Sequence, residues 1–354
     1  MKIARKLLIL IIICSISTPI FPQANDTIVV GIPIKNQEAE KYYNKGTTLL
    51  TEERMMEALE YFNKAIKLKP DFYQAYSNRG ALKYKVKDFE GALSDYDNSI
   101  KIKESSIAFL SRGLIKMELS DYLGAFNDFN KAIEIKPDYS DAYYYSGVVM
   151  FHLEDFEKAI EYFSKTLDID NKYIYAYNDR GSAYRKLEQY DNAINEYEKA
   201  IKVDTGFAFA YANIGSIKMK QHKFDEAYDY YSYAIKLKSD YYLAYNNRGT
   251  LLFELGKYEE ALVDFDAAIR LKPDYAFAYN NRGNARFKLK EYNNAINDYT
   301  KAIEINPKYG YAYLNRGITR EMLRDELGAC ADWTIAAELG IESGDNYVNQ
   351  QCKF

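Results

Sequence analysis

Asparagine and arginine recur side by side in front of a glycine in this sequence. The stretch YNNRG occupies residues 245–249 and returns at 279–283, with close variants at 76–80, 177–181 and 313–317. A guanidinium can pair with a carboxylate through two parallel hydrogen bonds, and a carboxamide can both donate and accept. These side chains could therefore bind a ligand or hold the fold together, and their spacing has to decide between the two.

Other residues that carry chemistry are scarce. There are two histidines, His152 and His222, and three cysteines, which is too little for a His/Cys metal site. No glycine-rich phosphate loop and no Gly-x-Ser-x-Gly turn is present. The formal net charge of -4 argues against a nucleic-acid partner. We therefore expect no enzymatic activity, no metal, no cofactor and no small-molecule substrate.

A repeat of 34 residues runs through most of the chain. Nine units start near residues 39, 73, 106, 140, 174, 208, 242, 276 and 310, and the second unit is one residue shorter. We number positions from these starts. Position 8 is glycine in every unit, position 20 is always alanine, and positions 4 and 24 are always aromatic. Small residues that alternate with large rings predict two closely packed helices in each unit.

This pattern resembles the tetratricopeptide repeat, over about residues 39–343. The resemblance implies an all-α fold, a right-handed α-solenoid superhelix of helix–turn–helix units. In each unit, helix A would cover about positions 2–14 and helix B about positions 15–28. The A helices would line a concave groove. Each unit buries only part of its apolar surface by itself, so stacking of the units is obligatory.

The arginine at position 7 varies together with position 23. Six units carry Arg and an acid: Arg79 and Asp95, Arg112 and Asp128, Arg180 and Glu196, Arg248 and Asp264, Arg282 and Asp298, and Arg316 and Asp332. The other three units have Lys45, Ser146 or Ile214 at position 7, and all three have Tyr at position 23. Covariation indicates contact, so we predict structural ion pairs between helix A and helix B.

The asparagine occupies position 6. It is found as Asn44, Asn78, Asn213, Asn247, Asn281 and Asn315, with Asp179 in the fifth unit. On a helical wheel, position 6 lies with positions 2, 9 and 13, opposite the packing face. In tetratricopeptide repeat proteins that bind peptides, Asn at this place holds the peptide backbone, so the resemblance implies a peptide-binding ladder of Asn78, Asn213, Asn247, Asn281 and Asn315. The alternative is a row of solvated polar residues on an exposed face.

Large apolar residues accompany this ladder in units 5–9. Position 2 holds Tyr175, Phe209, Leu243, Phe277 and Tyr311, and position 12 adds Met219, Phe253 and Phe287. Aromatic rings on a face that should be solvated suggest a binding surface. We expect Phe209, Leu243, Phe277, Tyr311, Phe253 and Phe287 to contact a peptide. The alternative is that these side chains pack against the preceding unit.

Both ends of the chain differ from the repeats. Residues 1–24 combine Lys2, Arg5 and Lys6 with an apolar run of about ten residues, too short to cross a bilayer, and we interpret them as an export signal. Residues 25–38 are expected to be an extended lead-in, and residues 344–354 a C-terminal cap. If that cap packs on the last helix B, Cys330 and Cys352 come within reach of a disulfide, which an exported protein could form.

The sequence thus predicts an exported, periplasmic or secreted scaffold without enzymatic activity. Its partner would be a protein or an extended peptide bound in the concave groove. Membrane association is expected only through the signal, if that segment is retained. The alternative function is a structural subunit of an exported assembly that uses its convex or terminal surfaces.

Overall fold

The computed structural model describes residues 37–352. These residues form an all-α solenoid, as the repeat pattern predicts, and no strand occurs between residues 37 and 352. They divide into two compact bodies, residues 37–203 and residues 204–352, each of which is described by itself. The signal segment and residues 25–36 of the lead-in lie outside the described residues.

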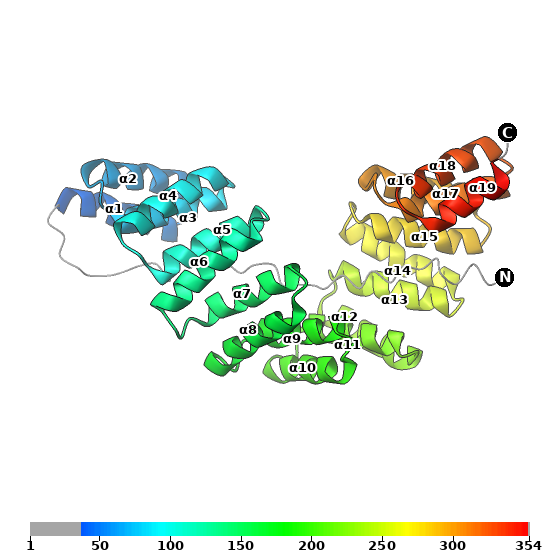
Figure 1. Cartoon of the computed structure of the whole chain (residues 1–354), viewed down its shortest axis with the longest axis horizontal. Coiled ribbons are helices and arrows are strands. Elements are labelled where there is room, and N and C mark those ends of the chain that lie inside the picture. Colours follow the sequence, from blue (N-terminus) through cyan, green and yellow to red (C-terminus); the bar gives the residue numbers. More distant parts are fainter. Residues whose placement is uncertain (1–36, 353–354) are drawn as a thin grey trace. The chain divides into compact units, whose positions relative to one another are not determined.

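The body of residues 37–203 holds five pairs of helices (Figure 1). Their bounds are α1 Gln37–Thr51, α2 Met55–Leu68, α3 Tyr73–Lys85, α4 Phe89–Ile102, α5 Ser106–Glu118, α6 Tyr122–Ile135, α7 Ser140–His152, α8 Phe156–Ile169, α9 Ile174–Lys186 and α10 Tyr190–Val203.

The body of residues 204–352 holds four further pairs and one additional helix. Their bounds are α11 Ala208–Lys220, α12 Phe224–Leu237, α13 Tyr242–Glu254, α14 Tyr258–Leu271, α15 Ala276–Lys288, α16 Tyr292–Ile305, α17 Gly310–Met322, α18 Glu326–Glu338 and α19 Glu342–Gln351. In both bodies, helix A packs on its own helix B, and helix B packs on the next helix A within that body.

The helix boundaries differ slightly from those expected. After the first unit, helix A runs from position 1 to position 13, and helix B starts at position 17 rather than 15. The turn between them passes through the left-handed region at position 15 in every unit. The residues there are Glu53, Lys87, Ser120, Glu154, Glu188, His222, Gly256, Lys290 and Arg324. Eight of these nine are not glycine, so the sequence does not mark the turn.

The side chain at position 16 starts helix B in several units. The carboxylates of Asp88, Asp121 and Asp325 each accept a hydrogen bond from the backbone N–H three residues later. This N-cap bond satisfies one of the amide groups that a helix N-terminus leaves without a partner. In these three units the side chain closes the turn, but helix B also begins at position 17 where no side chain caps it, as after Lys223 and Lys257.

In each unit, the glycine at position 8 of helix A packs against the ring at position 24 of helix B. A Cβ atom on Gly283 would come within 2.6 Å of the Tyr299 ring, so only glycine lets the two helices approach this closely. Alanines at positions 3, 20 and 27 are fully buried in unit 8, as Ala278, Ala295 and Ala302. The columns that define the repeat in the sequence are thus the contacts that bring helix A against helix B.

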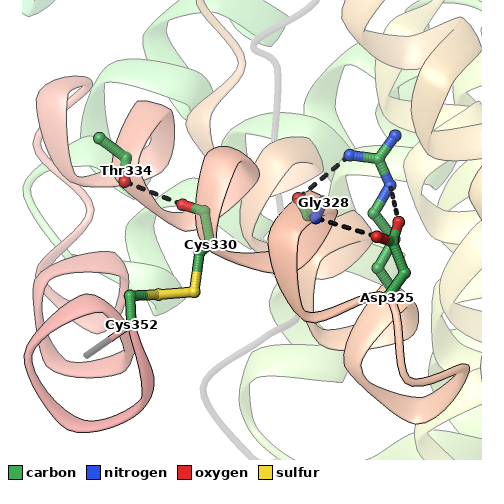
Figure 2. Close-up of a disulfide and its surroundings, with 6 residues drawn as sticks. Asp325, Gly328, Cys330, Thr334 and Cys352 are labelled. Atoms are coloured by element: carbon green, nitrogen blue, oxygen red, sulfur yellow. Dashed lines mark hydrogen bonds and ion pairs between the residues drawn. A yellow bond between two sulfur atoms is a disulfide. The ribbon is translucent and has the colours of Figure 1, made fainter. Parts of the chain in front are cut away.

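The helix α19 covers the last helix B. Its ring of Tyr347 stacks on Trp333 at 4.5 Å, and Gly344 lies so close to α18 that a Cβ atom would meet the Ala337 nitrogen at 2.7 Å. Cys352 is joined to Cys330 by a disulfide, with the two Cα atoms 5.7 Å apart (Figure 2). The helix starts at Glu342, two residues before the expected cap, because α18 already ends at Glu338.

Replacing both Cys330 and Cys352 with serine is expected to loosen α19. The disulfide links residues 22 positions apart, and a loop of that length gives a chain-entropy contribution of about 3 kcal/mol. Hydrogen exchange of the amides in residues 342–351 should therefore accelerate, while exchange in α15 stays unchanged. Reduced wild-type protein serves as the control and should match the variant. Equal protection of α19 in all three samples would show that packing alone holds this helix.

Candidate functional site

Each of the six arginines at position 7 binds the acid at position 23 of its own unit. The Nη2 atom lies 2.5–2.7 Å from a carboxylate oxygen in all six pairs. Five of the arginines place Nε on the second oxygen of the same carboxylate, as Arg248 does on Asp264 at 2.8 Å. Arg180 instead directs both nitrogens at one oxygen of Glu196, whose other oxygen accepts from Lys199.

The same arginines also reach the preceding unit. Their Nη1 atoms donate to position 25 of the preceding helix B. The acceptors are Asn63, Asp97, Ser164, Ser232, Asp266 and Thr300, at 2.6–3.0 Å. Each guanidinium also lies over the ring at position 4 of its own unit, 5.4–5.9 Å from the centroid. The arginine therefore joins three helices, and its nitrogens are occupied within the fold.

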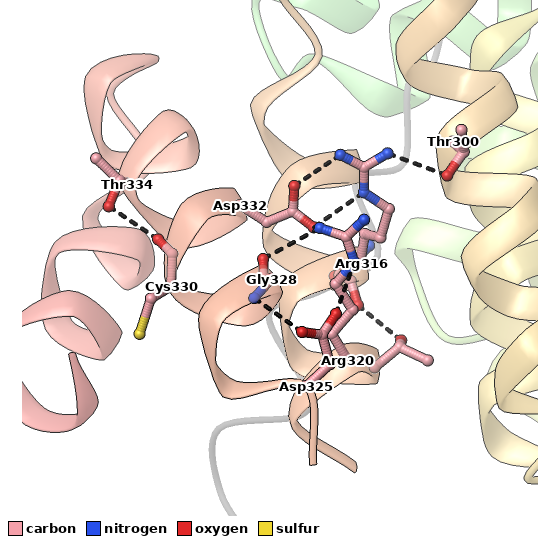
Figure 3. Close-up of polar contacts among 10 residues, drawn as sticks. Thr300, Arg316, Arg320, Asp325, Gly328, Cys330, Asp332 and Thr334 are labelled. Atoms are coloured by element: carbon pink, nitrogen blue, oxygen red, sulfur yellow. Dashed lines mark hydrogen bonds and ion pairs between the residues drawn. The ribbon is translucent and has the colours of Figure 1, made fainter. Parts of the chain in front are cut away.

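Position 11 supplies a second cation in four of these units. In unit 9, Arg320 donates to Asp332 at 2.9 Å beside Arg316, and it also donates to the Gly328 carbonyl (Figure 3). Arg286 forms an ion pair with Asp298 in the same way, and Lys83 and Lys116 form ion pairs with Asp95 and Asp128. Sequence reasoning missed these residues, although a cation four residues after the arginine at position 7 was a visible signal. They neutralise the buried carboxylate further.

Units without the arginine fill the same place with tyrosines. The rings at positions 4 and 23 lie 6.0–6.5 Å apart in the pairs Tyr42–Tyr61, Tyr143–Tyr162 and Tyr211–Tyr230. Each unit thus has either an ion pair or a ring contact between helix A and helix B at this place. This explains why the two residues change together in the sequence.

Most of the asparagines at position 6 are buried, so the expectation of a solvent-facing ladder is wrong for them. Asn78, Asn213, Asn281 and Asn315 are only 3–5% exposed. The amide of Asn281 donates to the Asn246 carbonyl oxygen at 3.1 Å, and that of Asn315 donates to Asn280 at 2.9 Å. The wheel placed position 6 opposite helix B correctly but did not include the neighbouring helix A, which covers it.

These contacts join position 6 to position 5 of the preceding unit, 35 residues earlier. Asn78 donates to the Tyr43 hydroxyl at 3.1 Å in the same way. At the corresponding place the preceding unit has Ala212, which offers no side-chain acceptor. Asn247 remains half-buried, with its carbonyl oxygen 3.4 Å from the Asn246 amide. Asn44, in the first unit, is exposed. Among the five predicted ladder residues, Asn247 alone retains substantial exposure.

Asp179 brings a carboxylate into this buried column. It is 1% exposed, and it accepts hydrogen bonds from the Tyr144 hydroxyl at 2.7 Å and from the Asn178 amide at 2.9 Å. Burial raises the pKa of Asp179 to about 7, although both hydrogen bonds favour the ionised form. The group therefore changes its charge near neutral pH.

The apolar residues of the predicted peptide site are half-buried or buried within the repeats. Phe209 and Phe277 lie against Tyr241 and Tyr309, with ring centroids 4.9 and 4.8 Å apart. Leu243 is 8% exposed, and Tyr311 packs beside the core around Leu314. Phe209 and Phe277 also contact the last residue of the preceding unit, Phe207 and Tyr275, at 5.3 and 5.6 Å between ring centroids. The alternative that these rings pack against the preceding unit therefore holds for both.

The two phenylalanines at position 12 pack on the start of their own helix B. Phe253 lies 5.3 Å from Tyr258, and Phe287 lies 5.5 Å from Tyr292. Both side chains stay half-buried, and their neighbours Glu254 and Lys288 at position 13 are exposed. The predicted groove of units 5–9 extends over both bodies, so we consider its part in units 6–9, which belongs to residues 204–352.

Within residues 37–352, no three or more His, Cys, Asp or Glu side chains come together as a metal site would require. No helix among these residues combines the length and the apolar character of a membrane-crossing segment. The ionisable groups that do gather are the arginine and carboxylate pairs, and these are satisfied within the fold. The accessible apolar and aromatic side chains are therefore the features that could bind a partner.

Family models described as tetratricopeptide repeat match residues 39–72, 108–139, 138–206 and 276–309. A further model, described as TPR repeat, matches residues 249–290. Among curated proteins, the UDP-N-acetylglucosamine–peptide N-acetylglucosaminyltransferase of Giardia intestinalis is 36% identical over 63 residues. That match spans 18% of this chain and only 4% of the relative's length, so its enzymatic activity does not carry over.

Solved structures share the arrangement of helices. Cut9 in the APC/C hetero-tetramer Cut9–Hcn1 covers 92% of this chain and 78% of its own, with a TM-score of 0.60 and 14% identity. Yeast Tom70 covers 90% and 89%, with a TM-score of 0.54 and 16% identity. PilF of Pseudomonas aeruginosa covers 58% and 94%, with a TM-score of 0.51 and 18% identity. At these identities the likeness concerns the fold alone.

Proposed function

Because this chain belongs to the tetratricopeptide repeat family, we propose that it is a non-enzymatic scaffold that binds an extended segment of a partner protein. The binding surface would be the side of the A helices that faces away from the B helices in units 6–9. The observation that carries this proposal is the row of half-buried rings at positions 2 and 12, next to exposed charged residues at position 13.

The chemistry of this surface suits an extended peptide with apolar side chains. Phe253 and Phe287 offer ring area that a ligand could cover, and rigid rings lose little conformational entropy on binding. Glu254 and Lys288 could orient the segment through its charges. The buried asparagines take no part in this proposal, because Asn78, Asn281 and Asn315 donate to the preceding repeat and Asn213 is only 4% exposed. Asn247 is the exception that could still contact a bound chain.

We also propose that the protein acts outside the cytoplasm. The basic and apolar residues of the segment 1–24 support export. The disulfide between Cys330 and Cys352 supports an oxidising compartment.

A photoreactive amino acid in place of Glu254 or Lys288 is expected to crosslink to the partner in the cells that make this protein. The same group at Val263 or Leu327, which are 69% and 74% exposed on B helices, should trap no partner and serves as the matched control. Exchange of both Phe253 and Phe287 for serine should then weaken binding of the trapped segment about tenfold or more.

Crosslinking at residue 263 or 327 alone would contradict binding of the partner to the A helices. It would favour the alternative function, a subunit that assembles through its outer face. Trapping at 254 or 288, followed by unchanged binding of the Phe253→Ser/Phe287→Ser variant, would place the partner on this side of the solenoid but away from the rings.

A further inference from the structure

The outer face of the sixth unit departs from the repeat pattern at several positions at once. Position 26 is lysine in five of the nine units, as Lys64, Lys131, Lys165, Lys199 and Lys301. The sixth unit has Tyr233 there. It also has Tyr228 at position 21, where the other units have aliphatic residues, phenylalanine or cysteine, and Tyr230 at position 23. Stacking of the repeats does not require Tyr228 or Tyr233, because the other units stack without a tyrosine at either position. Tyr230 at position 23 is shared with units 1 and 4.

The tyrosines form a cluster that reaches the surface. The Tyr211 ring lies 4.7 Å from Tyr233 and 6.4 Å from Tyr230, measured between centroids. Tyr228 and Tyr233 are 39% and 41% exposed, and no other Tyr, Phe or Trp side chain among residues 37–352 is as exposed as these two. An exposed aromatic cluster in a chain that otherwise covers its many rings is a candidate interaction surface.

The first unit shows what such a tyrosine pair binds. There, Tyr42 and Tyr61 hold the places of Tyr211 and Tyr230, with ring centroids 6.0 Å apart. The ammonium group of Lys64, at position 26, lies 4.8 Å from the Tyr61 ring and 6.0 Å from the Tyr42 ring. A cation over a ring face is attracted by the negative charge density of the π system. In the sixth unit, Tyr233 replaces that lysine and adds a third ring.

The cations around the cluster leave ring area open. Lys236 lies 6.0 Å from the Tyr233 ring, at the outer limit of a cation–π contact. Arg248 lies over Tyr228 at 5.5 Å, but its nitrogens are bound to Asp264 and Ser232. The 41% exposure of Tyr233 therefore remains available to a cation from another molecule.

Carboxylates border the cluster on the same helix. Asp225 and Asp229 precede Tyr233 by eight and four residues, so the three side chains share one face of α12. Both carboxylates are exposed, and neither makes an ion pair with any residue between 37 and 352. Glu226 is occupied by Lys218 at 2.6 Å. The surface thus combines ring faces with negative charge at its edge.

We propose that this outer face of α12 binds a basic segment of a partner protein. Lysine or arginine side chains of that segment would cover Tyr233 and the Tyr211–Tyr230 pair, in the way that Lys64 covers the pair of the first unit. Asp225 and Asp229 would pair with neighbouring cations of the segment. This site lies on a B helix and does not depend on peptide binding to the A helices.

The exchange Tyr233→Lys tests the proposal directly. It installs the residue that five other units carry at this position, so the fold is expected to be retained. The probe is a fluorescein-labelled peptide, Gly-Lys-Gly-Arg-Gly-Lys-Gly-Arg-Gly. A neutral peptide with norleucine for lysine and citrulline for arginine is the comparison. Fluorescence anisotropy at about 50 mM salt, where surface charges are weakly screened, reports affinity for the full-length protein.

Wild-type protein is expected to bind the basic peptide at least about tenfold more tightly than the neutral one. Tyr233→Lys should lose most of that preference, whereas Tyr233→Phe, which keeps the ring face, should retain it. Leu327→Lys adds the same charge to an exposed B-helix position of the same body and should leave binding unchanged.

Equal losses in Tyr233→Lys and Leu327→Lys would overturn the proposal, because binding would then follow net charge alone. Equal affinity of wild-type protein for both peptides would also overturn it, since the tyrosines would then act as a plain apolar surface.

Discussion

Replacing Asp179 with asparagine is expected to remove a loss of stability that the wild-type protein undergoes as pH rises from about 4 to about 7. Asp179 is buried, and its pKa is raised to about 7 in the folded state. An aspartate in the unfolded chain has a pKa of about 3.9. Between these two values the folded protein holds a proton that the unfolded chain has released.

The direction of the effect follows from this difference in bound protons. The free energy of unfolding changes with pH in proportion to the protons bound by the unfolded state minus those bound by the folded state. Here the difference is negative, so the contribution of Asp179 to stability is greatest below pH 4, falls through the window and is constant again above about pH 7. Over about three pH units the fall amounts to about 4 kcal/mol, because each unit corresponds to about 1.4 kcal/mol.

Asparagine in place of Asp179 does not titrate, and six of the other eight units carry asparagine in this column. The Tyr144 hydroxyl could still donate to its carbonyl oxygen. We therefore expect the stability of Asp179→Asn relative to wild type to rise by about 3 kcal/mol between pH 5 and pH 8, because about two pH units of the window lie in this range. Urea unfolding at both values measures this, and the difference between the two proteins cancels the contribution of every other group that they share.

The reciprocal exchange, Asn281→Asp, provides a matched control. Asn281 occupies the same position three units later and is 5% exposed. A carboxylate there should introduce a similar fall in stability with rising pH. Parallel pH profiles of wild type and Asp179→Asn would show that the carboxylate is solvated or paired in solution, and the proposed burial of charge would then be wrong.

The repeat architecture was predictable from the sequence because its contacts lie within one unit. Glycine at position 8 and the ring at position 24 meet in every unit, so nine copies report the same contact. The pairing of Arg248 with Asp264 was predictable for the same reason, since both residues change together within a unit. The nine units act as an internal comparison for everything that a single unit contains.

The placement of the asparagines failed because their contacts cross from one unit to the next. A wheel drawn for one helix leaves position 6 on a free face, but the preceding helix A covers that face. Asn281 and Asn246 are 35 residues apart, one more than the period, so a search for covariation inside each unit could not find them. The turn at position 15 escaped prediction for a different reason, because a backbone conformation that is normally marked by glycine is adopted there by other residues.

Arg248→Ala is expected to destabilise the protein by about 3–5 kcal/mol, which is the range for removing one partner of a buried ion pair. Asp264 is 3% exposed, and the two hydrogen bonds to its carboxylate come from the Nε and Nη2 atoms of Arg248. These bonds favour the charged guanidinium and raise the pKa of Arg248. The alanine variant would leave a buried carboxylate without its cation, and urea unfolding at pH 7 measures the cost.

The neighbouring unit supplies the control for this prediction. Arg282→Ala removes an equivalent arginine, but Asp298 keeps Arg286 at 2.7 Å. In unit 7, position 11 is Leu252, which cannot supply a second cation to Asp264. Arg248→Ala should therefore cost more than Arg282→Ala, although Arg282 also loses its bond to Asp266. Equal costs would mean that the second cation contributes nothing and that the two losses reflect packing.

A double exchange then separates charge burial from packing. Arg248→Ile with Asp264→Tyr copies the sixth unit, where Ile214 is fully buried and Tyr230 lies against the Tyr211 ring. This variant removes the arginine without leaving a buried charge, so it should be more stable than Arg248→Ala by about 2 kcal/mol or more. If both variants lost the same stability, the bond from Arg248 to Ser232 of the preceding unit would be the interaction that matters, and the arginine would act by joining units and not by neutralising Asp264.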